Sequence, residues 1–407
     1  MVRFIGVCDG CTTTKIFLKA QKLSFCSTDF AELPLSNSLH RASILGIDQI
    51  AACVVVVKIW CINQKDRMGN TPLGWAAING HEEVVQLLLG QDDIDPNKPN
   101  EDGRTPLLHA ACIGNEGIVK ALLRREDINP NQSGYRNRTP LYEAARCRHK
   151  GVVEMLLRRD DVDPNKMDWD GVTPLGWGVC HGDEAVVKML LERDDISPDR
   201  TNASEYSLTP LWMAAVRKKE GMVKILLGRD DVNPNAPNKS GQTPLYCAAR
   251  FGYEEVVRIL LERDEVNPDK PDKYGETPLY CAARDGHEGV VRILLERDEV
   301  NPDKPDKCGQ TPLWWAARSG RAGVVKILLG RDDVNPDTPD NNGQTPLYCA
   351  ARYGHEEVVR ILLERDEVNP DKPDRYGETP LSCATRYRHP RVIALLQPPT
   401  PAIYRTD

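Results

Sequence analysis

The sequence contains little of what nucleic-acid-binding or exported proteins usually contain. Acidic residues outnumber basic ones, 60 to 53, which gives a net charge of −7 and an isoelectric point of about 5.7. A chain that binds phosphates normally has a basic excess, so we expect no nucleic-acid partner. The apolar start, Met1 to Cys8, is too short for a signal peptide. The 13 cysteines, an odd number, are therefore expected as free thiols in a reducing compartment, the cytoplasm or the nucleus.

Long apolar runs and known catalytic motifs are also missing. The most apolar stretch, 44–62, is interrupted by Asp48 and Lys58, and its uncharged core is short for a membrane span. We therefore favour a packed helix there, with a membrane segment as the alternative. The sequence has no nucleophile elbow, Walker loop or dinucleotide-binding fingerprint. With 40% hydrophobic and 28% charged residues, the composition is that of a folded protein rather than a disordered one.

A repeat dominates what is present. The tripeptide Thr-Pro-Leu recurs every 34 residues, except for one interval of 36 between Thr173 and Thr209. Its ten threonines are Thr71, Thr105, Thr139, Thr173, Thr209, Thr243, Thr277, Thr311, Thr345 and Thr379. The period alone would also fit tetratricopeptide repeats, so the residues within one repeat have to decide the fold.

The copy from 273 to 306 predicts two short helices. Thr277 suits the N-cap of the first helix, Pro278 suits its first position, and Gly286 is placed to end it. A second, apolar helix is expected to begin near His287 and Glu288. The chain must then leave the helix at Val300-Asn301-Pro302-Asp303, because proline has no amide hydrogen to donate.

The pattern Thr-Pro-Leu-x-x-Ala-Ala-x-x-Gly-His resembles the signature of ankyrin repeats and covers residues from about 66 to 397. The resemblance implies an all-α repeat solenoid, a curved stack of helix-turn-helix units joined by hairpin-like loops. One departure concerns the link after the second helix. It reads Arg-Asp-Glu-Val-Asn-Pro-Asp here and usually contains a glycine in the family, which puts the shape of that loop in question.

This pattern divides the chain into four parts. Residues 1–36 form a non-repetitive segment that we expect to be disordered or to belong to another domain. Residues 37–70 are interpreted as a degenerate capping repeat, with Ala51 to Val57 as its second helix. Residues 71–397 contain the ten regular repeats, and 398–407 form a short tail.

The repeat position of most histidines and cysteines gives them a structural interpretation. His81, His149, His287, His355 and His389 all lie ten residues after the threonine of their repeat, and His109 and His181 fall on variable surface positions. Cys247, Cys281, Cys349 and Cys383 share one position that suits small packing residues. The lone Cys8-x-x-Cys11 is a weak zinc signal, and the aspartate spacing does not fit a calcium loop. We therefore expect no catalytic residue, no metal, no cofactor and no enzyme.

The predicted binding surface is a ladder of arginines seven residues after the threonines of five repeats, flanked by aromatic residues. The resemblance places variable contact residues on the concave side, on the turn tips and first helices. Arginine and tyrosine are favoured at binding hot spots, and a row of guanidinium groups suits an acidic strip. The candidate partner-binding residues are Arg250, Phe251, Tyr274, Arg284, Arg318, Arg352, Tyr353, Tyr376, Arg386 and Tyr387.

Two alternatives to this predicted binding surface remain. The arginines could instead form framework ion pairs with turn aspartates such as Asp272 and Asp306. The earlier repeats, with Trp75, Trp169 and Trp177, could form a more apolar contact zone.

The leading functional hypothesis is a monomeric scaffold or adaptor that binds a protein. The alternative, from a resemblance to fungal arrays, is the ligand-sensing part of a larger nucleotide-binding (NACHT), receptor-like signalling protein whose effector part is absent here.

Overall fold

The computed structural model describes residues 35–46, 48, 62–202 and 207–397, and every regular element within these ranges is a helix. By its contacts the chain divides into two compact parts, residues 1–197 and 198–407, which we name the N-terminal half and the C-terminal half. Among the described residues, no helix has both the length and the apolar character needed to cross a membrane.

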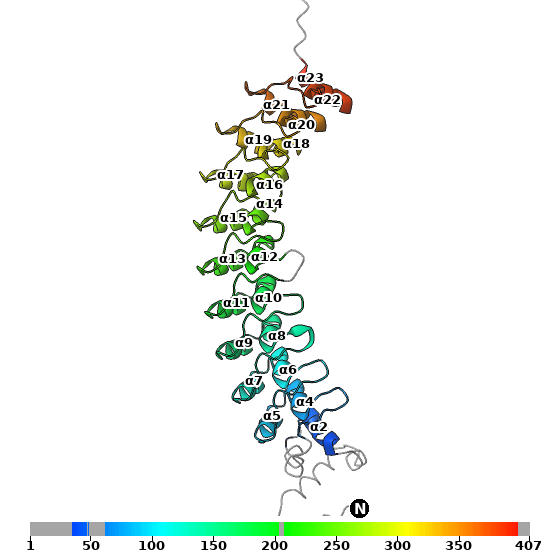
Figure 1. Cartoon of the computed structure of the whole chain (residues 1–407), viewed down its shortest axis with the longest axis vertical. Coiled ribbons are helices and arrows are strands. Elements are labelled where there is room, and N and C mark those ends of the chain that lie inside the picture. Colours follow the sequence, from blue (N-terminus) through cyan, green and yellow to red (C-terminus); the bar gives the residue numbers. More distant parts are fainter. Residues whose placement is uncertain (1–34, 47, 49–61, 203–206, 398–407) are drawn as a thin grey trace, which may run out of the picture. The chain divides into compact units, whose positions relative to one another are not determined.

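In the N-terminal half each regular repeat contributes a first and a second helix, and α2 adds one more first helix before them. The first helices pack on one another from repeat to repeat, and so do the second helices, so that each kind forms its own column (Figure 1). The first helices are α2 (Leu35–Leu45), α4 (Pro72–Asn79), α6 (Pro106–Ile113), α8 (Pro140–Cys147) and α10 (Pro174–His181). The second helices are α5 (Glu82–Leu89), α7 (Glu116–Leu123), α9 (Lys150–Leu157) and α11 (Glu184–Leu191), and the short 3-10 helix η2 (Tyr135–Asn137) lies in a turn.

The C-terminal half repeats the same arrangement. Its first helices are α12 (Pro210–Val216), α14 (Pro244–Arg250), α16 (Pro278–Asp285), α18 (Pro312–Arg318), α20 (Pro346–Tyr353) and α22 (Pro380–Tyr387). Its second helices are α13 (Glu220–Leu227), α15 (Glu254–Leu261), α17 (Glu288–Leu295), α19 (Ala322–Leu329), α21 (Glu356–Leu363) and α23 (Pro390–Leu396).

The predicted start and stop signals act where the sequence places them. The Thr277 hydroxyl accepts a 3.1 Å hydrogen bond from the Tyr280 amide, and the other nine threonines cap their helices in the same way. Gly286 ends α16 in the left-handed region, at φ 87°, and His287 precedes α17. The helix boundaries expected for this repeat are therefore confirmed.

The core lies between the two columns of helices. In the repeat of Thr277, the side chains of Leu279, Ala282, Val290 and Leu294 are fully buried, because they occupy the facing sides of two amphipathic helices. The cysteines of the shared position pack in the same core, next to buried tyrosines or Trp314. Burial raises the pKa of the Cys281 thiol to about 12, so it remains a packing group at neutral pH, as predicted.

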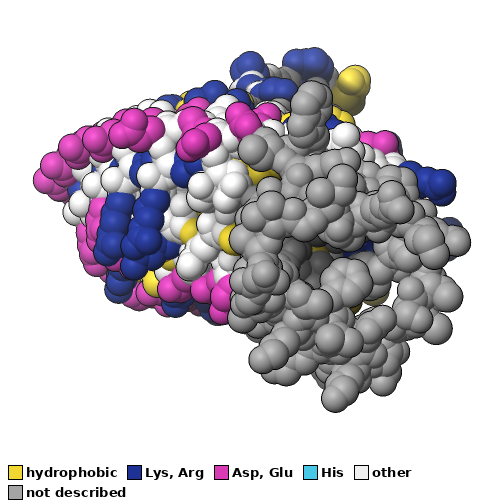
Figure 2. Space-filling view, turned by 90° about the horizontal axis from the view of Figure 1, so that it is seen from below, with side chains coloured by type: hydrophobic (Ala, Val, Ile, Leu, Met, Phe, Trp, Pro, Cys, Tyr) yellow, Lys and Arg dark blue, Asp and Glu magenta, His cyan; other side chains and the backbone are white. Residues whose placement is uncertain are grey.

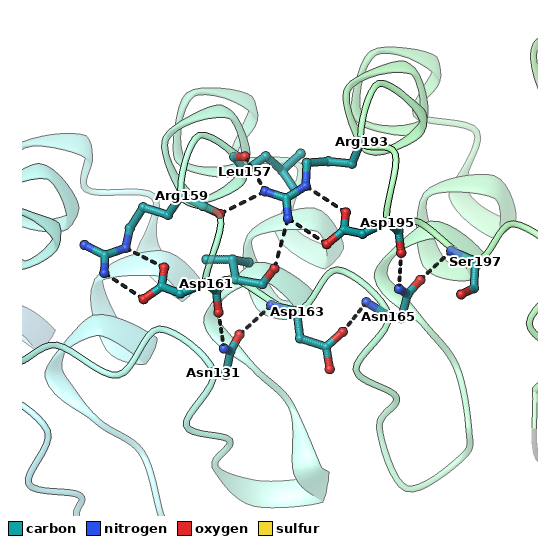
Figure 3. Close-up of polar contacts among 10 residues, drawn as sticks. Asn131, Leu157, Arg159, Asp161, Asp163, Asn165, Arg193, Asp195 and Ser197 are labelled. Atoms are coloured by element: carbon teal, nitrogen blue, oxygen red, sulfur yellow. Dashed lines mark hydrogen bonds and ion pairs between the residues drawn. The ribbon is translucent and has the colours of Figure 1, made fainter.

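In most repeats, an arginine just after the second helix ties the repeat to the one before it. Arg193 donates to the carbonyls of Leu157 (2.9 Å) and Arg159 (2.8 Å) in the preceding repeat, and to both oxygens of Asp195 in its own (Figure 3). The equivalent bond to a leucine carbonyl measures 2.8 to 3.0 Å for Arg125, Arg159, Arg263, Arg297 and Arg331. This arginine clamp holds the loop whose sequence departs from the family pattern.

Replacing Arg193 by Ala should lower the free energy of unfolding by about 1–2 kcal/mol, because it leaves two carbonyls in the preceding repeat without their donor. Urea denaturation measures the loss. Arg158 is the control, since its side chain is exposed and pairs only with Glu154, so Arg158→Ala should cost less than about 0.5 kcal/mol. Equal losses in the two variants would show that the clamp adds nothing to stability.

A row of asparagine side chains joins the loops that follow the second helices. The Asn131 side chain donates to the Asp161 carbonyl (2.5 Å) and accepts from the Asp163 amide (2.8 Å), both in the following repeat (Figure 3). Asn63, Asn97, Asn165 and Asn235 make the same pair of bonds. At five equivalent positions an aspartate replaces the asparagine. Four of these aspartates have one carboxylate oxygen buried without a hydrogen-bond partner: Asp199, Asp269, Asp303 and Asp337.

The N-terminal end of the array is described only in part. Helix α2 packs beside α4 as the first helix of a capping repeat would. His40 on this helix contacts the Asn70 carbonyl at 3.0 Å. The expected second helix at 51–57, residues 1–34 of the non-repetitive segment 1–36, and the tail 398–407 lie outside the described residues. Residues 35 and 36 of that segment begin α2. The capping role of 37–70 therefore remains a proposal.

Candidate functional site

The arginine ladder lies at the ends of consecutive first helices. Arg250, Arg284, Arg318, Arg352 and Arg386 occupy the last turn of α14, α16, α18, α20 and α22. These helices pack side by side in one column (Figure 1). Because each arginine has the same place in its helix, the structure brings one arginine per repeat to the same edge of the column.

The backbone of the ladder is fixed by the histidines that precede the second helices. Nε2 of His287, His355 and His389 lies 2.9 to 3.0 Å from the carbonyl oxygens of Arg250, Arg318 and Arg352, respectively. Arg321 takes the place of a histidine beside the Arg284 carbonyl, with Nε at 3.3 Å. These side chains therefore connect neighbouring repeats at the candidate surface, which gives the repeated histidines a structural role.

Two of the five arginines are neutralised within their own repeat. The Arg284 guanidinium lies 3.5 Å from Glu276 and 3.2 Å from Asp285, and Arg386 lies 3.0 Å from Glu378. The alternative considered above was that the ladder arginines form ion pairs with turn aspartates such as Asp272 and Asp306. These carboxylates are used within the turns instead, so the predicted ion pairs are wrong. Asp272 accepts from the Tyr274 and Glu276 amides (2.8 and 3.1 Å), which closes the turn.

Arg318 and Arg352 lie against aromatic rings. The Arg318 guanidinium carbon is 5.0 Å from the centre of the nearest Trp315 ring and 4.9 Å from the Tyr353 ring. Arg352 lies 5.9 Å from Tyr353 and 5.3 Å from Tyr387. These distances are in the range of cation–π interactions, so arginine and aromatic side chains alternate along the edge from α18 to α22.

The charges of Arg250, Arg318 and Arg352 remain available. Within the described residues, none of the three has a carboxylate oxygen in ion-pair range. The remaining candidates are exposed: Phe251 just after α14, and Tyr274 and Tyr376 on the turns, with 55% and 81% of their surface accessible. In the space-filling view, Lys and Arg side chains stack in columns, and rows of acidic side chains run along the neighbouring edges (Figure 2).

The alternative apolar zone in the N-terminal half is mostly packed. The Trp75 indole donates to Asp66 (2.7 Å), and Trp177 stacks on His181 with ring centres 4.1 Å apart. Trp169 and Tyr135 project together, 68% and 54% exposed, with ring centres 5.8 Å apart. Two exposed rings make only a small apolar area, so this zone is the weaker candidate.

His109 differs from its sequence interpretation. The surface position expected for it is wrong, because its side chain is buried on α6. Burial and the neighbouring Arg104 lower the pKa of His109 to about 4, although Asp102 opposes the shift. His109 is therefore neutral at physiological pH.

The family assignment rests on the whole array. A family model for ankyrin repeats matches residues 15–100, 39–133, 93–168, 127–202, 175–272, 264–340 and 332–407. The chain therefore belongs to the ankyrin-repeat family, and its fold is the all-α repeat solenoid predicted from the sequence. None of the curated proteins compared with the chain matches it. Ankyrin arrays generally bind proteins and are typically not enzymes.

Proposed function

We propose that the chain is a protein-binding scaffold or adaptor and that its arginine–aromatic edge binds an acidic segment of the partner. This edge consists of Arg250, Phe251, Tyr274, Arg284, Arg318, Arg352, Tyr353, Tyr376, Arg386 and Tyr387. The observation that carries the proposal is that Arg318 and Arg352 lie against aromatic rings without a carboxylate partner.

This arrangement favours carboxylate recognition for two reasons. A guanidinium held against a ring has already lost part of its conformational freedom, so less entropy is lost when it binds. Its planar fork can still donate two parallel hydrogen bonds to one carboxylate. With one arginine per repeat, an extended acidic strip fits better than a single acidic residue.

The same observations rank the arginines. Arg284 and Arg386 already pair with Glu276, Asp285 and Glu378, so a partner would have to displace those carboxylates. We therefore place the binding energy mainly on Arg318 and Arg352, with Tyr353 between them. The net charge of −7 supports a protein partner over nucleic acid, and we propose a monomer that acts in the cytoplasm or the nucleus.

A ligand-sensing array within a larger receptor-like signalling protein is the second candidate. The stretch Arg-Ile-Leu-Leu-Glu-Arg-Asp-Glu-Val-Asn-Pro-Asp-Lys-Pro-Asp occurs identically from Arg258, Arg292 and Arg360. A constant framework beside a varied edge suits a sensor as well as an adaptor. Both functions use the same surface, so one set of variants tests the surface for both.

The experiment compares two double variants that change the net charge equally. Lysate proteins captured by the wild-type chain are identified by mass spectrometry, and their affinities for each variant are then measured. Arg318→Ala with Arg352→Ala should weaken binding about 100-fold, or about tenfold for each arginine. Arg284→Ala with Arg386→Ala is the matched control and should change binding by less than about threefold, because both arginines are already neutralised.

Circular dichroism verifies that both double variants fold. If the first double variant binds the partner as tightly as the wild type, the edge is not the binding surface. If both double variants lose binding equally, the overall charge decides the affinity and the aromatic placement contributes nothing.

A further inference from the structure

Three potential metal ligands meet at the ends of two neighbouring first helices in the N-terminal half. Cys112 lies in the last turn of α6, and Glu143 and Cys147 lie one turn apart on α8. Their two sulfur atoms and one carboxylate oxygen all lie within 4.8 Å of one another. Within the described residues, this is the one group of three or more histidine, cysteine or acidic side chains that approach so closely.

Repeat packing creates this cluster from positions that are far apart in the sequence. Cys112 occupies the position that the arginine ladder uses in other repeats, and Cys147 lies one position later in the next repeat. Helix α6 packs on α8, and His149 Nε2 lies 3.0 Å from the Cys112 carbonyl, which fixes the end of α6 against the following repeat. The two cysteines are 35 residues apart, a spacing that resembles no metal-binding sequence motif, so nothing in the sequence leads us to expect a metal here.

We propose that Cys112, Glu143 and Cys147 bind a thiophilic divalent cation, with Zn²⁺ as the physiological ion and water as the fourth ligand. Zinc bonds thiolates at about 2.3 Å and carboxylates at about 2.1 Å, so ligand atoms on a tetrahedral zinc are about 3.5–3.8 Å apart. Separations within 4.8 Å therefore need side-chain adjustments of about 1 Å. Two thiolates and one carboxylate also match the ligand preference of zinc over magnesium and calcium.

The surrounding charges suit such a complex. Two thiolates and a carboxylate around Zn²⁺ leave one net negative charge. Arg146 lies 2.7 Å from one Glu143 oxygen, and Arg138 lies 3.5 Å from the other. A carboxylate has enough lone pairs to accept from arginine and bind a metal at the same time, so the two arginines orient Glu143 and offset that charge.

The three ligands differ in solvent exposure, and the difference suits a metal site that an ion can enter. Glu143 is 2% exposed, whereas Cys112 and Cys147 are half-buried. The sulfur side of the cluster thus gives an ion a path from solvent, and the two thiol protons can leave to water when the metal binds. Because the ligands come from consecutive repeats, the bound ion would link α6 to α8.

The test uses Co²⁺ as a spectroscopic probe on the full chain under reducing conditions, followed by competition with Zn²⁺. Co²⁺ bound to thiolates gives a charge-transfer absorption that zinc should displace. Cys112→Ser and Cys147→Ser should each weaken Zn²⁺ binding about 100-fold or more, and Glu143→Gln about tenfold. Cys308→Ser removes an exposed cysteine of the C-terminal half and should leave binding unchanged.

Thermal unfolding supplies a second measurement, because a ligand that binds only the folded state stabilises it. Zinc should raise the melting temperature of the wild type and of Cys308→Ser, but not that of Cys112→Ser. If Cys112→Ser and Cys147→Ser keep the full cobalt absorption of the wild type, the proposal is overturned. The proposal would also be overturned if the wild-type chain showed no cobalt absorption and Cys112 and Cys147 were found joined by a disulfide. The two cysteines would then be a redox-active pair rather than metal ligands.

Discussion

Replacing Gly114 by Ala should destabilise the N-terminal half by about 2–3 kcal/mol. Gly114 ends α6 at φ 84°, where a residue with a β-carbon costs about 1–2 kcal/mol. The added Cβ would also lie 2.4 Å from Nδ1 of His149, so the ring has to move. That movement breaks the contact between His149 and the Cys112 carbonyl, which we value at about 1 kcal/mol. Urea denaturation followed by circular dichroism measures the sum.

The preceding repeat offers a matched control. Gly80 occupies the same position at φ 76°, but it faces the Asn115 side chain, which lies 3.4 Å from the added Cβ. Gly80→Ala should therefore cost only the backbone term, about 1–2 kcal/mol. Adding His149→Asn to Gly114→Ala recreates the Gly80–Asn115 pair. The new asparagine can cap α9 as Asn115 caps α7, by accepting from the Ile118 amide at 3.0 Å, whereas His149 makes no such bond. This cap should offset the lost contact with the Cys112 carbonyl, so the loss should fall to the level of Gly80→Ala. A Gly114→Ala variant no less stable than Gly80→Ala would contradict the steric argument.

Replacing both Asp199 and Asp303 by Asn should stabilise the C-terminal half by about 2–3 kcal/mol at neutral pH. Each aspartate accepts one amide hydrogen bond, at 2.8 and 2.6 Å, but its second oxygen is buried without a partner. At the equivalent position Asn235 donates to the Glu265 carbonyl. Asparagine at 199 and 303 should supply this bond and remove a buried charge, for about 1–1.5 kcal/mol at each site. The two sites share no partner, so their effects should add.

Asp269 provides the control, because Lys304 pairs with its carboxylate at 2.8 Å. Asp199 and Asp303 have no such lysine, because the position equivalent to Lys304 is occupied by Ala236 and by Thr338, respectively. Asp269→Asn gains the amide donor but loses the ion pair, so we expect little net change in stability. A gain equal to that at Asp303 would show that the lysine does not matter.

The pH dependence of the asparagine variants follows from the raised pKa values. Burial raises the pKa of Asp199 and of Asp303, while the amides that they accept from act in the opposite direction. A carboxyl with a raised folded-state pKa binds protons more tightly when folded, so the wild type gains stability as the pH falls through that pKa. The advantage of the asparagine variants should therefore be full above the folded pKa values and shrink below them. An advantage that stays constant as the pH falls would contradict the titration of these carboxyls.

Features encoded within one repeat were predictable from the sequence. Thr277 and Gly286 act through the backbone of their own helix, so their positions alone give the helix boundaries. The repeated cysteine position is another such case, because one amphipathic pattern places Cys281 in the core. These are local effects, and the 34-residue period repeats them without change.

Contacts between repeats were not predictable in the same way. The arginine clamp binds backbone carbonyls, which carry no sequence signal, and the pairing of Arg284 with Asp285 depends on side-chain direction. Arg146 also occupies the ladder position, but its bond to Glu143 could be identified only once α8 was folded. The sequence therefore located the ladder, whereas the structure shows which of its arginines remain available to a partner.

The arginine clamps have a consequence for how the array can change in length. Each clamp joins a repeat to its immediate neighbour, and the group it binds is a leucine carbonyl in every case measured. Deleting residues 273–306 would bring Arg331 to the Leu261 carbonyl instead of that of Leu295, with the same donor and the same acceptor. A gene that lost or duplicated one such segment would encode a chain in which the newly adjacent repeats still form the bond between arginine and leucine carbonyl. The number of repeats can therefore change in evolution without loss of stability at the contact between repeats.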